Sequence, residues 1–209
     1  MEASISKLLQ ISGEPLGSTS DIELNPAYGR LGVELAELLR AVNGFYAFES
    51  ALHVFPVGSA GDALSQEGWN EDQLWRVEYC GMADGYLFFA EDCFGGQFGI
   101  RGEMIYSFDP ETGEASPMAA SMEEWASRLL GDFEVETGYP LAHEWQSRYG
   151  QLQQGFRLLP KRPFVLGGEY SVHNLHALDA AKGMRLRAEL AVQIRDLPDG
   201  AVIKYSVFD

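Results

Sequence analysis

Two neighbouring carboxylates beside a cysteine form the segment of this sequence that is best placed to do chemistry. Glu91, Asp92 and Cys93 follow an apolar run and precede the pair Gly95-Gly96. Carboxylates in such a loop could bind a cation or a basic side chain. An exposed turn is the simpler interpretation, and it is the one that we favour, because carboxylates are abundant throughout the chain.

The histidines and cysteines offer two further chemistries. His173 and His176 have a spacing that occurs in metal sites, but two more ligands would be needed, so we interpret them as partly exposed loop residues. Cys80 or Cys93 could pair with His53 as a nucleophile, yet nothing in the sequence places them together. Buried free thiols or polar strand residues are the favoured interpretation, since two cysteines cannot make a disulfide framework.

Motifs that would identify an enzyme are absent from the sequence. It contains no P-loop, no GxGxxG, no HExxH and no GxSxG elbow. We therefore expect no catalysis, no cofactor and no metal. A hydrolase that uses Glu91, Asp92 or His53 stays open as an alternative, and a deep pocket with perturbed carboxylates would support it.

Apolar periodicity and turn chemistry predict the elements that position these residues. An apolar stripe predicts a helix over 30–43, which Asn43-Gly44 ends, and the spacing of Ser121 and Glu124 fits a capping box for a helix over 121–130. Further helices are predicted at 1–11, 62–75, 140–153 and 186–194. Strands are predicted at 51–56, 87–90, 97–100, 104–108 and 202–207. Consecutive short strands joined by tight loops favour an antiparallel meander.

The charge is unevenly distributed along the chain. The formal net charge is -16, but residues 1–150 carry -18 and residues 151–209 carry +2. The acidic part repels phosphate backbones and anionic membranes, so we expect neither nucleic-acid nor membrane binding. It attracts basic proteins. Plain solubility is the alternative explanation of the acidity.

The cellular location follows by elimination. The first residues lack the basic and apolar regions of a signal peptide, and no apolar stretch approaches the roughly 20 residues of a membrane span. We therefore expect a cytoplasmic protein.

A family resemblance rests on the order of several segments. These are the helix stop Asn43-Gly44, the run 88–98 with its Gly95-Gly96 turn, the hairpin 106–114 and the helix around Trp125. In this order the segments resemble the SMI1/KNR4, or SUKH, superfamily over roughly residues 25–135. The resemblance implies an α+β fold with a mixed or antiparallel sheet flanked by helices, and no catalysis.

The resemblance also implies a function. Many bacterial members of the superfamily are immunity proteins that neutralise toxins, often nucleases, while fungal members are regulatory interaction proteins. We therefore expect a binding module whose partner is a basic toxin domain, or, as an alternative, a housekeeping interaction protein without a toxin partner. The candidate partner-binding residues are Glu91, Asp92, Phe94, Tyr46 and Glu49.

Two parts of the chain are expected. Residues 1–150 form the SUKH-like domain, and residues 151–209 form a C-terminal extension of the kind carried by some bacterial members. Because the extension is basic and the domain acidic, we expect the two to dock, with Arg185, Arg187 and Arg195 facing acid.

Overall fold

A six-stranded antiparallel sheet is the centre of the part of the chain that the computed structural model describes, residues 3–19, 22, 25–58, 61, 64–198 and 200–201. Neighbouring strands are consecutive in the chain, so the sheet is the predicted meander. The strands are β1 (Phe45–Ala47), β2 (Leu52–Val54), β3 (Leu87–Asp92), β4 (Gln97–Arg101), β5 (Met104–Phe108) and β6 (Ala115–Ala119). A second sheet pairs β7 (Phe156–Pro160) with β8 (Leu175–Asp179). The predicted α+β class is confirmed.

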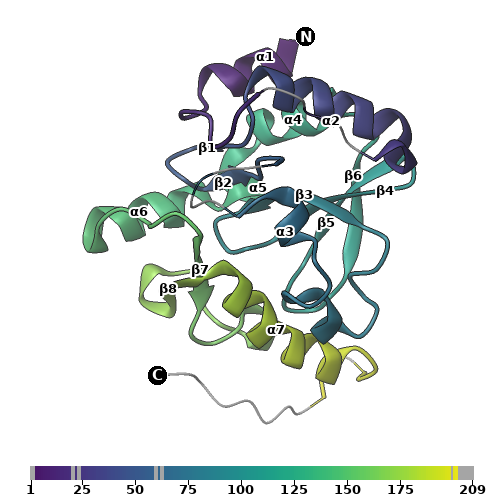
Figure 1. Cartoon of the computed structure of the whole chain (residues 1–209). Helices are drawn as coiled ribbons and strands as arrows, with labels where there is room; N and C mark the ends of the chain where they lie inside the picture. The colour runs from purple at the N-terminus through teal and green to yellow at the C-terminus, as the bar shows by residue number, and fades with distance from the viewer. Residues whose placement is uncertain are drawn as a thin grey trace.

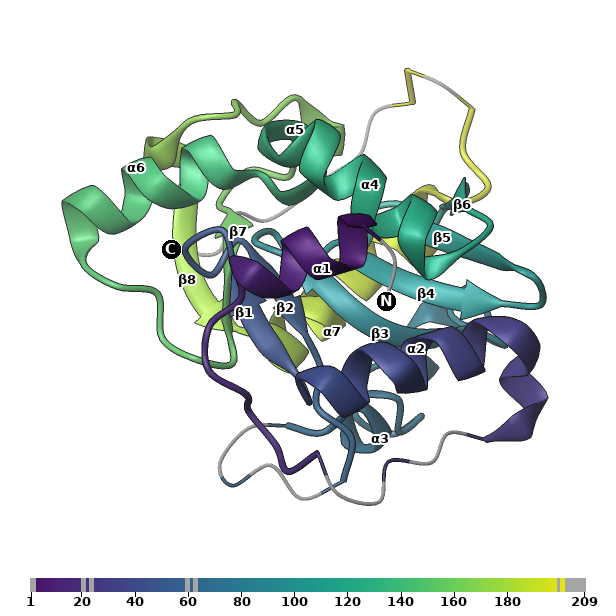
Figure 2. The same ribbon diagram turned by 90° about the horizontal axis from the view of Figure 1, so that it is seen from above.

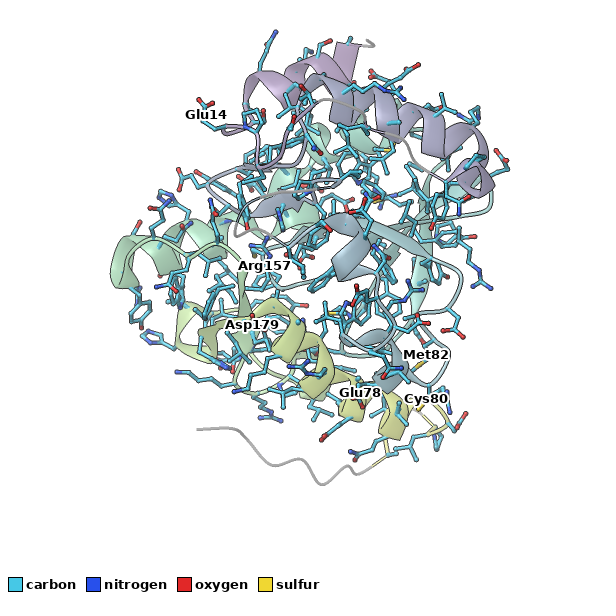
Figure 3. The ribbon with its side chains drawn as sticks, viewed as in Figure 1. Glu14, Glu78, Cys80, Met82, Arg157 and Asp179 are labelled. Carbon is cyan, nitrogen blue, oxygen red and sulfur yellow. The ribbon has the colours of Figure 1, made fainter. Side chains whose placement is uncertain are left out.

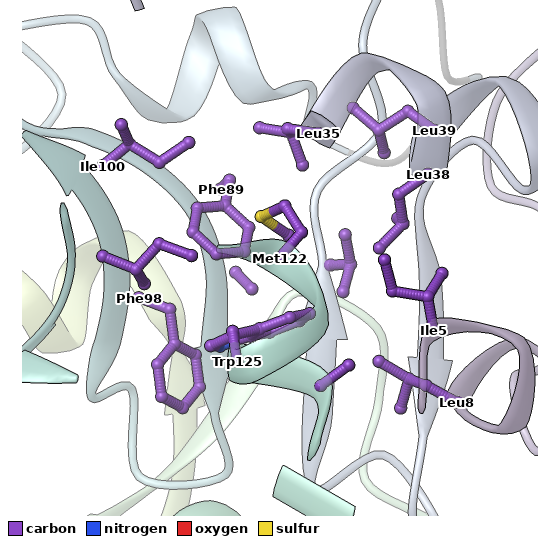
Figure 4. Close-up of a cluster of buried hydrophobic side chains, with 14 of the residues drawn as sticks. Ile5, Leu8, Leu35, Leu38, Leu39, Phe89, Phe98, Ile100, Met122 and Trp125 are labelled. Carbon is purple, nitrogen blue, oxygen red and sulfur yellow. The ribbon is translucent and has the colours of Figure 1, made fainter. Parts of the chain in front are cut away.

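Three helices cover one face of the six-stranded sheet. They lie above it in Figure 1, and Figure 2 shows all three from above. They are α1 (Ala3–Gln10), α2 (Gly29–Ala41) and α4 (Met122–Gly131). Their apolar stripes meet the sheet in one cluster, in which the Trp125 ring lies 5.1 Å from Phe89 and 5.8 Å from Phe98 between ring centroids (Figure 4). Burying these large side chains is a main source of stability for the domain.

The C-terminal part of the chain covers the other face. Helix α7 (Ala180–Ile194) packs against the sheet through Met184, in a cluster with the aromatic residues Phe55, Trp69, Trp75, Tyr79, Phe88 and Phe108. Two arginines of this region donate to backbone carbonyls of the domain: Arg185 to Leu74 at 3.0 Å and Arg195 to Cys80 at 3.3 Å. Figure 3 places Cys80 beside the end of α7. Residues 151–198 therefore share a hydrophobic core with the sheet.

The predicted N-cap of α4 is confirmed, but α2 ends earlier than predicted, at Ala41, because Val42 is already extended. The Ser121 hydroxyl accepts a hydrogen bond from the Glu124 N–H at 3.0 Å and begins α4. Gly44 follows α2 with φ +69, and an added Cβ there would lie 2.5 Å from the Pro56 nitrogen. Glycine is therefore required at this position both for its dihedral and for the close approach of the chain.

Several predicted boundaries are wrong or untested. The helix predicted over 62–75 is, among the described residues, only α3 (Gln66–Trp69), because Asn70 leaves the helix and pairs twice with the backbone of Phe88, at 2.7 and 2.9 Å. The sequence did not predict β1, β6, β7, β8 or the helix α5 (Phe133–Thr137). The helix predicted over 140–153 is α6 (Tyr139–Tyr149). The strand predicted over 202–207 lies outside the described residues.

Candidate functional site

The turn between β3 and β4 is built around Asp92. Its Oδ1 accepts hydrogen bonds from the N–H groups of Phe94 at 2.7 Å and Gly96 at 2.8 Å. At Gly95, φ is +79, and an added Cβ would lie 2.6 Å from Nη2 of Arg187 on α7. The interpretation of Glu91 and Asp92 as an exposed turn is wrong, because C-terminal residues cover the turn: Glu91 is buried and Asp92 is half-buried.

A pocket of about 400 Å³ opens beside this turn. Three segments enclose it: the β3–β4 turn, the loop that follows β5, and residues 164–170 of the C-terminal part. We call it the acidic–aromatic pocket. Its charged and aromatic lining residues are Asp92, Asp109, Glu111, Arg187, Phe94, Phe164 and Tyr170. Three carboxylates thus face a single guanidinium.

Glu111 is the most unusual residue of the pocket. It is only 4% exposed, and its Oε2 accepts a hydrogen bond from the Val165 N–H at 2.8 Å. Its Oε1 has no hydrogen-bond partner among the described residues. Burial raises the pKa of Glu111 above its usual value, although Arg187 and the N–H donors of 164 and 165 oppose this. A buried carboxylate oxygen without a hydrogen-bond partner is costly.

The other charges respond to the same environment. Burial raises the pKa of Asp92 to about 7, against the lowering effect of its two N–H donors and of Arg187. Arg187 is 4% exposed and donates hydrogen bonds to the carbonyl groups of Gly183 and Phe94. The Arg187 guanidinium lies near the carboxylates of the pocket, but it forms no ion pair with any residue that the structure describes.

One wall of the pocket is aromatic and faces solvent. Phe164 and Tyr170 stack with ring planes 1° apart and centroids 4.0 Å apart, and Phe94 meets Phe164 edge to face at 5.4 Å. Tyr170 is 69% exposed, and the neighbouring Val165 is 44% exposed. Aromatic faces beside carboxylates suit a cationic side chain, which gains both an ion pair and a cation–π contact.

The predicted site residues therefore separate into different places. Asp92 and Phe94 line the acidic–aromatic pocket, whereas Glu91 lies on β3 with its side chain turned into the protein. Oε1 of Glu91 is 2.8 Å from Nε of Arg157 and 3.1 Å from Nδ1 of His53. A basic side chain beside Glu91, which the sequence left open as an alternative to an exposed turn, thus comes from the same chain. A carboxylate that is 1% exposed does not form part of an acidic surface.

Tyr46 belongs to this buried cluster. Its ring stacks on His53 at 4.3 Å between centroids, and the Arg157 guanidinium lies 5.4 Å from its centroid on the aromatic face. Burial would raise the pKa of Glu91, but the Arg157 charge and the hydrogen bonds from His53 and Gln97 hold it below its usual value. Burial lowers the pKa of His53. The cluster therefore contains a carboxylate, a guanidinium and a neutral imidazole.

Glu49 lies apart from both clusters, on the loop between β1 and β2. Its carboxylate is exposed and hydrogen-bonded to Nδ1 of His143 at 2.8 Å and to the hydroxyl of Tyr139 at 3.2 Å. Three consecutive residues of this loop, 48–50, have φ between +50 and +69, a left-handed conformation that is unfavourable for side chains other than glycine. Three side chains of α6, those of Tyr139, His143 and Gln146, hydrogen-bond to Glu49 of this loop.

The remaining residues singled out from the sequence either have a structural role or do not form the pairs that were considered. Asn43 is buried and exchanges two hydrogen bonds with the backbone of Val57, at 2.8 and 2.9 Å. The Cys93 thiol faces the Gly138 carbonyl at 3.6 Å and not His53. His173 is exposed, and His176 is half-buried on β8. Within the described ranges no three His, Cys, Asp or Glu side chains are grouped as metal ligands.

The sequence did not identify Glu111, Arg187 or Tyr170 as members of one pocket. Glu111 lies in the turn 109–114, which was recognised, but its burial comes from residues 164 and 165, far along the chain. The only local signal was the segment Phe164–Tyr170, which has an aromatic residue at each end and a glycine pair between them.

Comparison with known proteins supports the fold alone. No protein-family model matches the sequence, and no curated protein matches it. The structure is similar to the crystal structure of Atu4351 from Agrobacterium tumefaciens, with a TM-score of 0.52 and 14% sequence identity over 87% of this chain and 86% of that chain. In the described part of the chain no helix is both long and apolar enough to span a bilayer.

Proposed function

We propose that this protein is a non-catalytic binding module whose acidic–aromatic pocket receives an arginine or lysine side chain of a partner protein. The observation that carries the proposal is the buried carboxylate of Glu111, whose Oε1 has no partner among the described residues. An incoming guanidinium or ammonium would pair with this oxygen and with Asp92, and it would reach the exposed face of Tyr170. Each of these interactions is stronger in a half-enclosed pocket than on an open surface.

The surroundings of the pocket fit a protein interface. Exposed aromatic side chains beside a desolvated pocket are typical of residues that dominate binding energy. Tyr170 and Val165 provide the apolar contact, and the acidic surface of residues 1–150 would accelerate the encounter with a basic partner. Exposed ion pairs contribute only about 0–1 kcal/mol each, so the affinity must come mainly from the pocket.

The partner that we propose is a toxin domain, and the protein is then a cytoplasmic immunity protein of the SUKH type. The SUKH-like order of segments and the α+β fold support this assignment, as does the net charge of -18 over residues 1–150. A toxin nuclease binds its nucleic acid through a basic cleft. An acidic surface that places carboxylates against such a cleft would block access of the phosphate backbone.

Co-expression with candidate toxin domains from the same genome tests this proposal. We expect rescue of growth by the wild-type protein and loss of rescue in Glu111→Gln and Tyr170→Ala. Glu103→Gln is the matched control, because Glu103 is an exposed acid in the turn between β4 and β5, at the other end of these strands from the pocket. Equal rescue by all four proteins would contradict the pocket, and no rescue by the wild type would contradict the toxin partner.

A housekeeping interaction protein of the same fold is the second candidate. It would use the same pocket, and the position of the gene separates the two: a toxin gene next to it favours immunity, and an isolated locus favours the housekeeping function. An affinity that does not change between low and high salt would contradict recognition by charge in either case.

A hydrolase at the same pocket is the third candidate, and one observation favours it. The pKa of Asp92 is raised to about 7 and that of Glu111 is also raised, which is the pattern of a carboxylic acid poised to donate a proton. Turnover of ester or glycoside substrates that is abolished in Asp92→Asn would establish an enzyme. The binding module predicts no turnover in either protein.

A further inference from the structure

A second pocket, of about 200 Å³, lies on the same side of the sheet as α7 but outside the acidic–aromatic pocket. It opens between β2 and the beginning of α7. Its walls include three aromatic rings and two alanines, so they are mainly apolar. The principal lining residues are Tyr46, His53, Phe55, Trp69, Ala180 and Ala181.

One polar atom in this apolar surrounding has no partner. His53 is 3% exposed and lines the pocket, and its Nε2 makes no hydrogen bond to any residue that the structure describes. The other ring nitrogen, Nδ1, is 3.1 Å from Oε1 of Glu91, which is held as a carboxylate by Arg157 at 2.8 Å. Because a carboxylate only accepts hydrogen bonds, the proton of the neutral ring belongs on Nδ1. Nε2 is then an acceptor.

We propose that this pocket binds a single neutral phenolic ring, whose hydroxyl donates a hydrogen bond to Nε2 of His53. A cavity of about 150 Å³ accepts one benzene ring, whereas drug-sized ligands need roughly 300–1,000 Å³, so the pocket has room for one ring and not for a nucleotide. Phe55 and Trp69, whose rings are 4.9 Å apart, provide aromatic faces for it.

The charges beside the pocket select against other ligands. The Glu91 carboxylate that lines the pocket is already paired with Arg157 at 2.8 Å, so it offers little to a cation, and an anion would meet this carboxylate and the lone pair of Nε2. A purely apolar ring would leave Nε2 unpaired. The phenolic group can come from a free small molecule or from a tyrosine side chain of a partner, which present the same chemistry.

An NMR titration of the full chain with phenol and with toluene tests this proposal. The two ligands have similar shapes, but only phenol can donate. We expect the His53 ring resonances to shift with phenol, and phenol to bind about 2- to 10-fold more tightly than toluene, as one buried hydrogen bond predicts. Toluene binding as tightly as phenol, or phenol leaving the His53 resonances unchanged, would overturn the proposal.

Two variants locate the ligand. Ala181→Leu places a larger side chain in the pocket and should abolish phenol binding, whereas Tyr170→Ala in the acidic–aromatic pocket should leave it unchanged. Phenol binding to Ala181→Leu at wild-type affinity would contradict the site. If that variant does not fold, the comparison of phenol with toluene on the wild type still decides. Binding of N-acetyl-tyrosinamide with the same His53 shifts would assign a tyrosine side chain, and binding of phenol alone would assign a free molecule.

Discussion

Nε of Arg157 lies 2.8 Å from Oε1 of Glu91, and both side chains are 1% exposed. The pair joins β7 of the C-terminal part to β3 of the six-stranded sheet. Leu158 extends this junction through its N–H, which donates to the Cys93 carbonyl at 2.8 Å. Glu91, which the sequence suggested as a surface carboxylate, is thus the buried counter-ion of Arg157 in the C-terminal part of the chain.

Removing the guanidinium should strongly destabilise the protein. In Arg157→Met the carboxylate of Glu91 stays buried without its counter-ion, which costs about 3–5 kcal/mol in the free energy of unfolding. The double variant Arg157→Met/Glu91→Gln removes both charges and should recover a large part of this loss. Urea unfolding at pH 7 measures both. A loss below about 1 kcal/mol in the single variant would contradict a buried ion pair.

The contribution of Asp92 to the stability of the folded protein should fall as the pH rises from about 4 to about 7. The pKa of Asp92 is raised from 3.8 to about 7 in the folded state, so in this range the folded state binds more protons than the unfolded state. The contribution of Asp92 to stability is therefore present near pH 4 and is lost as the pH passes about 7.

Asp92→Asn tests this pH dependence. The amide oxygen can still accept the N–H groups of Phe94 and Gly96, but it does not titrate. We expect the variant to be more stable than the wild type at pH 8, by roughly 1–3 kcal/mol, with a flatter pH profile. Thermal unfolding from pH 4 to pH 8 measures it, and parallel profiles for the two proteins would rule out a shifted Asp92.

Local chemistry in the sequence predicted the parts of this fold that depend on near neighbours. The Ser121 cap, the left-handed conformation of Gly44 and the β3–β4–β5 meander each depend on residues a few positions apart. The short strand β1 was missed because three residues carry no alternation that could be recognised.

The candidate site was predictable only in part, for a different reason. Asp92 and Phe94 stood out because they precede a glycine pair. The burial of Glu111, however, depends on the backbone of Val165, and Glu91 is buried against Arg157 instead of lying in an exposed turn. Which distant segment covers a carboxylate is decided by tertiary packing. A single sequence contains no signal for it.

Glu111→Gln should separate stability from binding. Burial raises the pKa of Glu111, so the charged side chain is less stable in the folded than in the unfolded state. The neutral amide should therefore stabilise the free protein by about 1 kcal/mol at pH 8 and should weaken the binding of a basic partner. Chemical denaturation and a binding titration measure the two effects. A variant that is less stable and binds equally well would contradict the function of this residue.

Gly95→Ala should displace Arg187 from the pocket. The variant suffers strain at φ +79, and its Cβ would lie 2.6 Å from Nη2 of Arg187. Gly102→Ala is the matched control, because it has φ +59 and no atom within 4 Å of the added Cβ. Backbone strain costs both variants about 1–2 kcal/mol, and we expect a further loss of about 1 kcal/mol or more in Gly95→Ala alone. Equal losses would show that the approach of Arg187 is unimportant.

The central claim is that the acidic–aromatic pocket recognises a basic side chain, and a titration with N-acetyl-arginine amide tests it most directly. The N-acetyl-citrulline amide, which has nearly the same shape but no charge, is the control. We predict that the arginine compound shifts the Phe94, Gly96 and Tyr170 resonances. Its binding should be several-fold tighter at pH 8 than at pH 6, because Asp92 ionises near pH 7. The citrulline compound should show no such pH dependence. Equal binding of the two compounds, or shifts confined to residues outside the pocket, would contradict the account.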